Sequence, residues 1–300
     1  MKEKYLNEGL VGNKVLKASF TSKGELLRLL YGCADYKEFI DTFHTGIKVN
    51  DSALIYLHED INNTYEQEYI ENTNILKTEI YNSYFKVRIT QIDFVPINEN
   101  VLIKKYVIKN ENEIDLNINF LAYSKALTNL NNDTSGYVKN DALIQYNHDY
   151  SVCTFSNREI YRRQVNGAIN DFYKGEITGK DYIGMSCDSA ISYKLDNFAP
   201  SEEKIITLFV YVNENSKNDV LRIDDEIERL KNLNIEVLKN EAKEYWNNYV
   251  KNHDILNISE KDLSYDIKKI YYRSILIFAL LINEKTGGIL VGIEIEENKK

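Results

Sequence analysis

The sequence is short of several residue types, and each shortage excludes a class of protein. Only two prolines, three cysteines and four histidines occur among the 300 residues. The cysteines (Cys33, Cys153 and Cys187) are odd in number and far apart, and no C-x-x-C spacing occurs. This pattern favours reduced, mostly buried thiols in a cytoplasmic protein over a disulfide framework or a zinc knuckle.

Positive charge and long apolar runs are also scarce. Lysine and arginine number 37 against 46 acidic residues, which gives a formal net charge of −9. An acidic surface repels phosphate backbones, so we expect no nucleic-acid partner. The longest apolar run, from Ile275 to Ile282, is well short of the ~20 residues that a membrane span needs. The polar N-terminus also lacks the apolar segment of a signal peptide, so we expect no membrane partner and a cytoplasmic location.

The residues that are abundant indicate a folded protein. Hydrophobic residues make up 43% and charged residues 28% of the chain, which suffices for a real core. Tyrosine is abundant, with 23 copies. Two interpretations stay open at this point: a bias in codon usage, or a β-rich surface whose rings stack on sugars.

Up to about residue 215, apolar and polar residues alternate with the period of half-buried strands. In residues 84–90, Phe85, Val87 and Ile89 share one face, and residues 114–120 repeat this pattern. Similar segments occur at 49–57, 102–108, 151–155 and 204–212. Many short strands without intervening helices predict a mainly β protein, a large two-sheet antiparallel β-sandwich. One short helix is expected at residues 168–174.

After residue 215 the apolar period changes to that of amphipathic helices. Val220, Ile223, Ile227 and Leu230 predict a first helix, and apolar residues between 237 and 249 predict a second. Asn234 and Asn240 do not reveal where these helices begin. Trp246 and Tyr249 of the second helix are most simply core residues, with a stacking platform as the alternative.

A third helix is expected from about Ser259, as N-cap, to residue 282, and Gly287-Gly288 follow its end. Its second half, Ile275 to Ile282, is apolar on nearly every side, which is typical of a helix that other elements surround. We expect this stripe to dock on the sandwich, or to stay exposed and cause self-association.

Most catalytic motifs are absent. No phosphate-binding loop and no H-E-x-x-H sequence occurs. Residues 184–188 resemble a nucleophile elbow but end in Asp188 rather than glycine, and Cys187 is better explained as a core thiol. His44 and His58 could bind a metal with Glu59 or Asp60, although strand histidines more often pack or hydrogen-bond.

The remaining carboxylates are best interpreted as solvated surface groups. Glu59 and Asp60 follow a strand, where a loop could display functional groups, but a solvated strand end is the preferred interpretation. Glu294, Glu296 and Glu297 resemble a solvated tail. The residues alone therefore predict no catalytic, cofactor-binding or metal-binding residue and no cofactor.

The order of segments along the chain resembles the N-terminal portion of bacterial glucoamylase-type proteins of glycoside hydrolase family 15. The resemblance runs through residues 12–20, 23–31, 43–52, 57–63, 145–150, 179–186 and 286–290. It implies a sandwich similar to mutarotases at residues 1–214, a helical linker at 215–258, and at 259–300 the first helix and loop of an (α/α)₆ barrel. Thr286, Gly287 and Gly288 would form a loop at the barrel mouth.

The resemblance also implies a function. The family's two catalytic glutamates lie in the rest of the barrel, which this sequence does not contain, so neither role is assigned here. We expect a non-catalytic N-terminal portion, inactive alone, of an inverting α-glucan exo-hydrolase, whose partners are the missing barrel and, through it, α-glucans or malto-oligosaccharides.

Two alternatives to this function stay open. The first is a carbohydrate-binding sandwich. The second is a mutarotase-like epimerase, which would need His44 or His148 beside a carboxylate.

Overall fold

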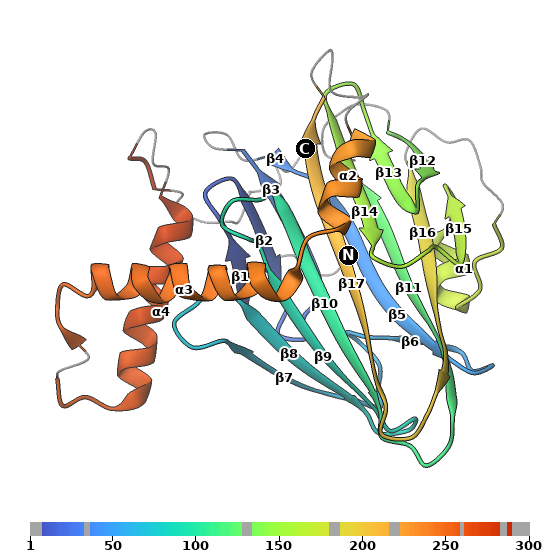
Figure 1. Cartoon of the computed structure of the whole chain (residues 1–300), viewed down its shortest axis with the longest axis horizontal. Coiled ribbons are helices and arrows are strands. Elements are labelled where there is room, and N and C mark those ends of the chain that lie inside the picture. Colours follow the sequence, from blue (N-terminus) through green and yellow to red (C-terminus); the bar gives the residue numbers. More distant parts are fainter. Residues whose placement is uncertain are drawn as a thin grey trace, which may run out of the picture.

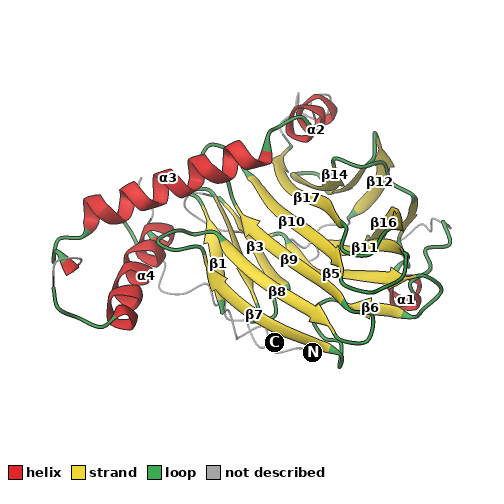
Figure 2. Ribbon diagram, turned by 60° about the horizontal axis from the view of Figure 1, so that its bottom comes forward, coloured by secondary structure: helices red, strands yellow, loops and turns green. Residues whose placement is uncertain are grey.

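The computed structural model describes residues 8–32, 37–127, 134–179, 187–215, 223–258, 261–282 and 287–289. Two layers of antiparallel strands make up most of the described chain, and helices lie on both outer faces and at one edge (Figures 1 and 2). The predicted β-sandwich followed by helices is confirmed.

One layer is, within the described residues, an eight-stranded antiparallel sheet. Its strands, in spatial order, are β12 (Ser135–Lys139), β13 (Ala142–Tyr146), β14 (Tyr150–Ser156), β17 (Glu203–Glu214), β10 (Val101–Asn110), β9 (Val87–Phe94), β8 (Leu76–Asn82) and β7 (Asn63–Tyr69). The last strand in sequence, β17, lies in the middle, between β14 and β10.

The other layer consists of two smaller sheets in the described part of the chain. The first has the order β1 (Gly9–Gly12), β2 (Leu16–Phe20), β3 (Leu26–Tyr31) and β4 (Lys37–Glu38). The second has the order β15 (Arg162–Val165), β16 (Asp188–Phe198), β11 (Leu116–Ala126), β5 (Ile40–Val49) and β6 (Leu54–Tyr56).

The main core lies between the two layers, and period-two alternation builds it. On β11, Leu116, Ile118 and Phe120 are buried in this core, while the residues between them face outward. On β5, Phe43 and Ile47 point into the same core. His44 lies between these inward positions and therefore belongs to the opposite face of its sheet.

The helices in the described residues are α1 (Ile169–Lys174), α2 (Ile223–Lys231), α3 (Ile235–His253) and α4 (Tyr265–Leu281). The short helix expected at 168–174 is confirmed as α1. Helices α2 and α3 lie along one end of the outer face of the eight-stranded sheet (Figure 2), with Ile227 and Ala242 packed in one cluster with Phe94 and Phe155.

Helix α4 packs against α3 and β1 rather than on the sheet face (Figure 1). Leu276 and Leu280 of α4 are buried in one cluster with Leu10 of β1 and with Trp246 and Val250 of α3. The interpretation of Trp246 as a core residue is therefore confirmed. None of the described helices combines the length and apolarity needed to cross a membrane.

Several expected boundaries were wrong. Residues 49–57 are not one strand, because a turn at residues 50–53 separates β5 from β6. The strand expected from residue 84 begins at Val87, after a turn. The third helix starts at Tyr265 and its N-cap is Ser264, whose hydroxyl accepts from the Ile267 amide, whereas Ser259 lies outside the described residues.

Two further corrections concern the helices. Asn234, which seemed uninformative, is the N-cap of α3, and its side chain accepts hydrogen bonds from the amides of Glu236 and Val237. The second half of α4 is also not surrounded. Leu276 and Leu280 are buried, but Phe278 is 52% exposed. The apolar stripe is thus covered on one side only.

Candidate functional sites

The expected barrel-mouth loop follows α4. Thr286 lies outside the described residues, whereas Gly287 and Gly288 are described. An isolated antiparallel bridge between Ile282 and Ile289 brings the chain back beside the end of α4. Gly287 has a φ of 67°, a left-handed conformation that favours glycine. Its role at a barrel mouth stays a prediction.

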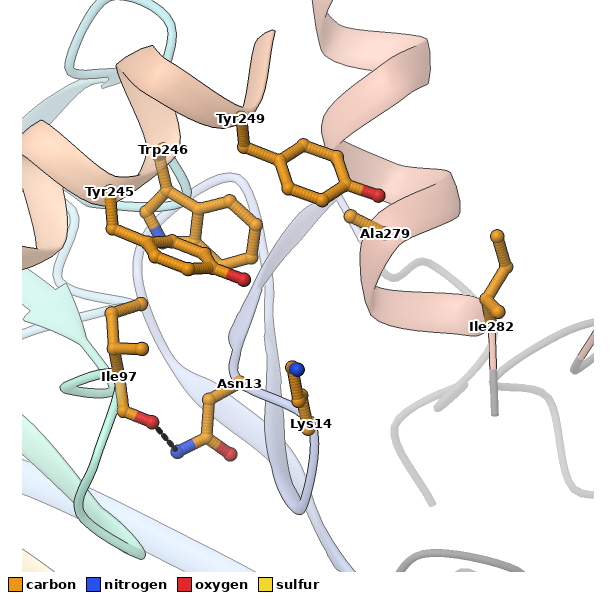
Figure 3. Close-up of a pocket in the computed structure, with 8 residues that line it drawn as sticks. All are labelled: Asn13, Lys14, Ile97, Tyr245, Trp246, Tyr249, Ala279 and Ile282. Atoms are coloured by element: carbon orange, nitrogen blue, oxygen red, sulfur yellow. Dashed lines mark hydrogen bonds between the residues drawn. The ribbon is translucent and has the colours of Figure 1, made fainter. Parts of the chain in front are cut away.

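Next to this turn is a pocket of about 50 Å³ between α3, α4 and two loops of the sandwich (Figure 3). The residues that line it are Asn13, Lys14, Ile97, Tyr245, Trp246, Tyr249, Ala279 and Ile282. The Asn13 amide donates hydrogen bonds to the carbonyl oxygens of Pro96 and Glu99, both at 2.9 Å. Sites for drug-sized ligands occupy about 300–1,000 Å³, so this pocket has room for a few waters and not for a sugar ring.

A half-buried arginine fixes α4 to the sandwich. The Arg273 guanidinium lies 3.5 Å from the ring centroid of Tyr69, and it donates to the carbonyl oxygens of Thr73 at 3.0 Å and Leu10 at 3.3 Å. The Asn74 amide donates to the Leu276 carbonyl at 3.4 Å. These contacts join α4 to β1 and to the β7–β8 turn. The position of this helix is therefore specified by polar contacts as well as by apolar packing.

A second candidate site lies on the outer face of the five-stranded sheet, around His44 of β5. Its Nδ1 lies 2.6 Å from the Tyr56 hydroxyl and 3.1 Å from a carboxylate oxygen of Glu25, and Tyr56 also donates to Glu25. Glu25 immediately precedes β3, and Tyr56 ends β6. Three separate segments thus supply one hydrogen-bonded cluster. Burial, followed by the charge of Glu25, raises the pKa of Tyr56, so its hydroxyl keeps its proton.

Aromatic side chains enclose the imidazole of His44. Tyr123 is directly opposite on β11 and stacks on it with a centroid separation of 5.8 Å. Phe172 and Tyr173 of α1 both lie 6.1 Å from it, centroid to centroid. Phe172 is buried in a small cluster with Tyr123 and Ala168, which seats α1 on the sheet, whereas Tyr173 is largely exposed.

A buried polar network lies nearby, between the layers. The Nε2 of His58 is 3.1 Å from the Gln91 side-chain oxygen, and the Gln91 amide donates to Asp93 at 2.6 Å. Asp93 pairs with Lys104 at 2.7 Å, and both side chains are 0% exposed. Burial lowers the pKa of His58 to about 3, so this imidazole is neutral at pH 7. Buried charge at this density is unusual for a simple packing core.

The metal site considered for His44 and His58 does not assemble. His44 faces Glu25 on the outer face and His58 faces Gln91 between the layers. Asp60 accepts a hydrogen bond from the Asn62 amide in its own turn. Within the described part of the chain, no group of three His, Cys, Asp or Glu residues is placed to hold a metal ion.

The remaining sequence candidates do not gather into a site. Cys187 is buried in the main core, as expected, and burial raises its pKa. The rest of the elbow-like segment, residues 184–186, lies outside the described residues, as do Glu294, Glu296 and Glu297. His148 pairs with Asp149, its neighbour in sequence, at 2.7 Å, with its side chain 93% exposed. Of the two histidines considered for an epimerase, only His44 therefore lies beside a carboxylate with both side chains largely shielded from solvent.

Sequence reasoning missed the partners of these groups. Glu25 and Tyr56 lie 31 residues apart, and no spacing rule connects them to His44. No sequence pattern singled out Arg273. One signal was available: the alternation of Phe43, Thr45 and Ile47 places His44 on the face opposite the core. The cross-strand neighbours that complete the cluster depend on strand order, which the sequence does not reveal.

Comparison with known proteins supports a glycoside hydrolase-like fold. An uncharacterised glycosyl hydrolase of Methanocaldococcus jannaschii is 28% identical over 294 residues, which cover 94% of this chain and 46% of that protein. A bacterial glucoamylase solved with acarbose superposes with a TM-score of 0.70 at 15% identity, over 92% of this chain and 40% of its own. A proposed kojibiose phosphorylase from the human microbiome gives 0.57 at 12% identity, over 81% of this chain and 35% of its own.

No protein-family model matches the sequence. The chain spans about half the length of the curated relative that it matches. Both similar structures also continue well beyond the part that the chain covers. These likenesses establish the fold of this chain.

Proposed function

We propose that this chain is the non-catalytic N-terminal portion of a glucoamylase-type α-glucan exo-hydrolase of glycoside hydrolase family 15. In this proposal the sandwich and linker helices support an (α/α)₆ barrel, and that barrel acts on α-glucans or malto-oligosaccharides. The likeness to the bacterial glucoamylase over 92% of this chain supports the proposal, as does the order of the resembling segments. The cytoplasmic location stays a prediction.

The observation that carries the proposal is the two-sided character of α4. Leu276, Leu280 and Arg273 hold one side of this helix on the sandwich. Ile267, Ile270 and Phe278, three or eight residues apart, lie on the opposite side and are each more than half exposed. At about 100° per residue, these three positions form one stripe. An anchored helix with an open apolar stripe is suited to receive further helices.

The first test is enzymatic. The chain as it stands should release no glucose from maltotriose, because no described cluster supplies an acid and a base across a sugar-sized pocket. A longer chain that continues into the coding sequence downstream of residue 300 should be active if that sequence encodes the barrel. Glucose release by the 300-residue chain at the rate of a hydrolase would contradict the proposal.

The second test concerns the open stripe of α4. We expect the isolated chain to self-associate through this stripe. The stripe includes Phe278, which belongs to the segment from Ile275 to Ile282 that was expected to cause self-association. The double variant Ile270→Ser, Phe278→Ser should shift the chain towards monomer in multi-angle light scattering. The matched control is Ile114→Ser, a 59% exposed isoleucine before β11. A monomeric wild type, or an equal effect of the control, would argue against this interface.

A stand-alone carbohydrate-binding sandwich is less well supported. The exposed tyrosines of the described chain are spread over the β8–β9 turn, β12, β13, the loop before β15, α1 and the start of α4: Tyr84, Tyr137, Tyr146, Tyr161, Tyr173 and Tyr265. Tyr137 and Tyr146 contact each other, but their rings are inclined at 72° and form no flat platform. Retardation of the chain in glycogen-containing gels would restore this alternative.

The mutarotase-like alternative has one observation in its favour, the meeting of His44 with Glu25. Polarimetry of freshly dissolved α-D-glucose tests it. Accelerated mutarotation that is lost in His44→Gln and kept in His148→Gln would support an epimerase. An uncatalysed rate with the wild type would remove this alternative.

A further inference from the structure

We propose that Glu25, Tyr56 and His44 form a binding site for a neutral monosaccharide, with Nε2 of His44 accepting a hydrogen bond from a sugar hydroxyl and the ring of Tyr173 covering one face of the sugar. This site is separate from the α4 surface, so the proposal does not depend on the supporting role proposed above.

The first step of the argument is the protonation of His44. With Glu25 as a carboxylate, the single hydroxyl proton of Tyr56 is donated to Glu25. Nδ1 of His44 is 2.6 Å from the Tyr56 oxygen and 3.1 Å from Glu25, and both of these atoms then act as acceptors. Nδ1 therefore carries a proton, and in the neutral imidazole Nε2 keeps its lone pair.

The second step is the availability of Nε2. It has no hydrogen-bond partner among the described residues, and it is not one of their buried, unpartnered atoms. The His44 side chain keeps 10% of its surface exposed. The sandwich thus fixes one edge of the imidazole with the buried Glu25 and the half-buried Tyr56, and leaves the acceptor atom open to a ligand. His58 contrasts with it, because its Nδ1 is sealed in the core.

The third step is the chemistry of the surroundings. Tyr173 is 52% exposed and lies 6.1 Å from the imidazole, so its ring can cover the apolar face of a pyranose. Glu59, Glu25 and Asp188 act electrostatically on Tyr56 or Tyr123 in the same cluster. Their negative field disfavours anionic ligands. An acceptor atom, an exposed ring and nearby carboxylates together select a neutral hydroxyl donor, the chemistry of an uncharged sugar.

The test is NMR spectroscopy of the histidine rings in the full chain. With four histidines in the sequence, the ring signals can be assigned by substitution. Long-range ¹⁵N–¹H spectra should show His44 protonated at Nδ1 and bare at Nε2. D-glucose should shift this signal with a dissociation constant of about 1–10 mM, and sodium glucuronate should bind more weakly.

Variants separate binding from packing. Tyr173→Ala should weaken glucose binding about three- to tenfold, while leaving the fold intact, because the side chain is exposed. Tyr84→Ala is the matched control, an exposed tyrosine in the β8–β9 turn, and His148→Gln is the control for an exposed imidazole. The proposal is wrong if His44 carries its proton on Nε2, if glucose leaves its signal unchanged, or if Tyr173→Ala binds like wild type.

Discussion

The buried ion pair between Lys104 and Asp93 offers the sharpest test of the core. Lys104→Met removes the charge but keeps an unbranched side chain over the ring of Phe20, which lies 4.7 Å from the ammonium group. Asp93 then stays 0% exposed and loses its partner at 2.7 Å, retaining the Gln91 amide. Breaking one side of a buried pair costs about 3–5 kcal/mol, and we expect a loss of this size in the free energy of unfolding.

A double-mutant cycle separates the pair from its surroundings. Asp93→Asn alone leaves the Lys104 charge buried and should also destabilise the chain. The double variant Asp93→Asn, Lys104→Met has no buried charge, and the new amide can still accept from Gln91. Its free energy of unfolding should lie within about 1–2 kcal/mol of the wild type. The loss in the double variant should therefore be much smaller than the sum of the losses in the two single variants.

The pH dependence gives a further check with a defined sign. In Lys104→Met, burial raises the pKa of Asp93 and no cation opposes it, so the folded state takes up a proton more readily than the unfolded state. The destabilisation relative to wild type should therefore shrink as the pH falls from 8 to 5. Urea denaturation followed by circular dichroism measures both effects. A variant within about 1 kcal/mol of wild type at every pH would refute the buried pair.

Two more predictions concern His58 and Arg273. His58 has a folded-state pKa of about 3, below its ordinary value of 6.5. Between these two pH values the unfolded chain binds a proton at His58 and the folded chain does not. Stability should fall by up to about 1.4 kcal/mol per pH unit on acidification below 6.5, and His58→Gln should flatten this slope in urea titrations; an unchanged slope would contradict the assignment. Arg273→Met removes two charged hydrogen bonds and the contact with Tyr69, each hydrogen bond worth about 1.5–3 kcal/mol. In Arg273→Met, the rate of amide hydrogen exchange in α4 should rise at least tenfold while β10 stays protected. The surface control Arg88→Met should leave the exchange rate in α4 unchanged. Equal protection of α4 in both variants would refute the anchoring of this helix by Arg273.

The sandwich was predictable because each of its main strands buries at least the face that meets the other layer. Every second residue of β10, β11, β14 and β17 faces this core, most of these residues are apolar, and the expected segments overlap the observed strands. Residues 49–57 misled the prediction, because the end of β5 and the whole of β6 are both apolar and the turn between them is short. Ser259 misled it because Ser264, five residues on, is an equally good N-cap.

The candidate site was predictable in part only. His44 could be placed on the outer face of a strand by alternation, and a carboxylate partner was the condition set for an epimerase. The identity of that partner, Glu25, depends on the approach of β3, a strand of the neighbouring four-stranded sheet, to β5, and no local pattern reveals this long-range contact. The anchoring of α4 by Arg273 likewise depends on a contact across 263 residues, between Arg273 and Leu10.

The central place of β17 has a consequence for the order of folding. Strands β7 to β10 form one meander and β12 to β14 another, and each can form from neighbouring segments as it leaves the ribosome. The two meanders share no hydrogen bonds until β17 pairs with β10 on one side and β14 on the other. The eight-stranded sheet is therefore completed only after synthesis has passed Glu214, and until then β10 and β14 expose edges that can pair with the wrong strand.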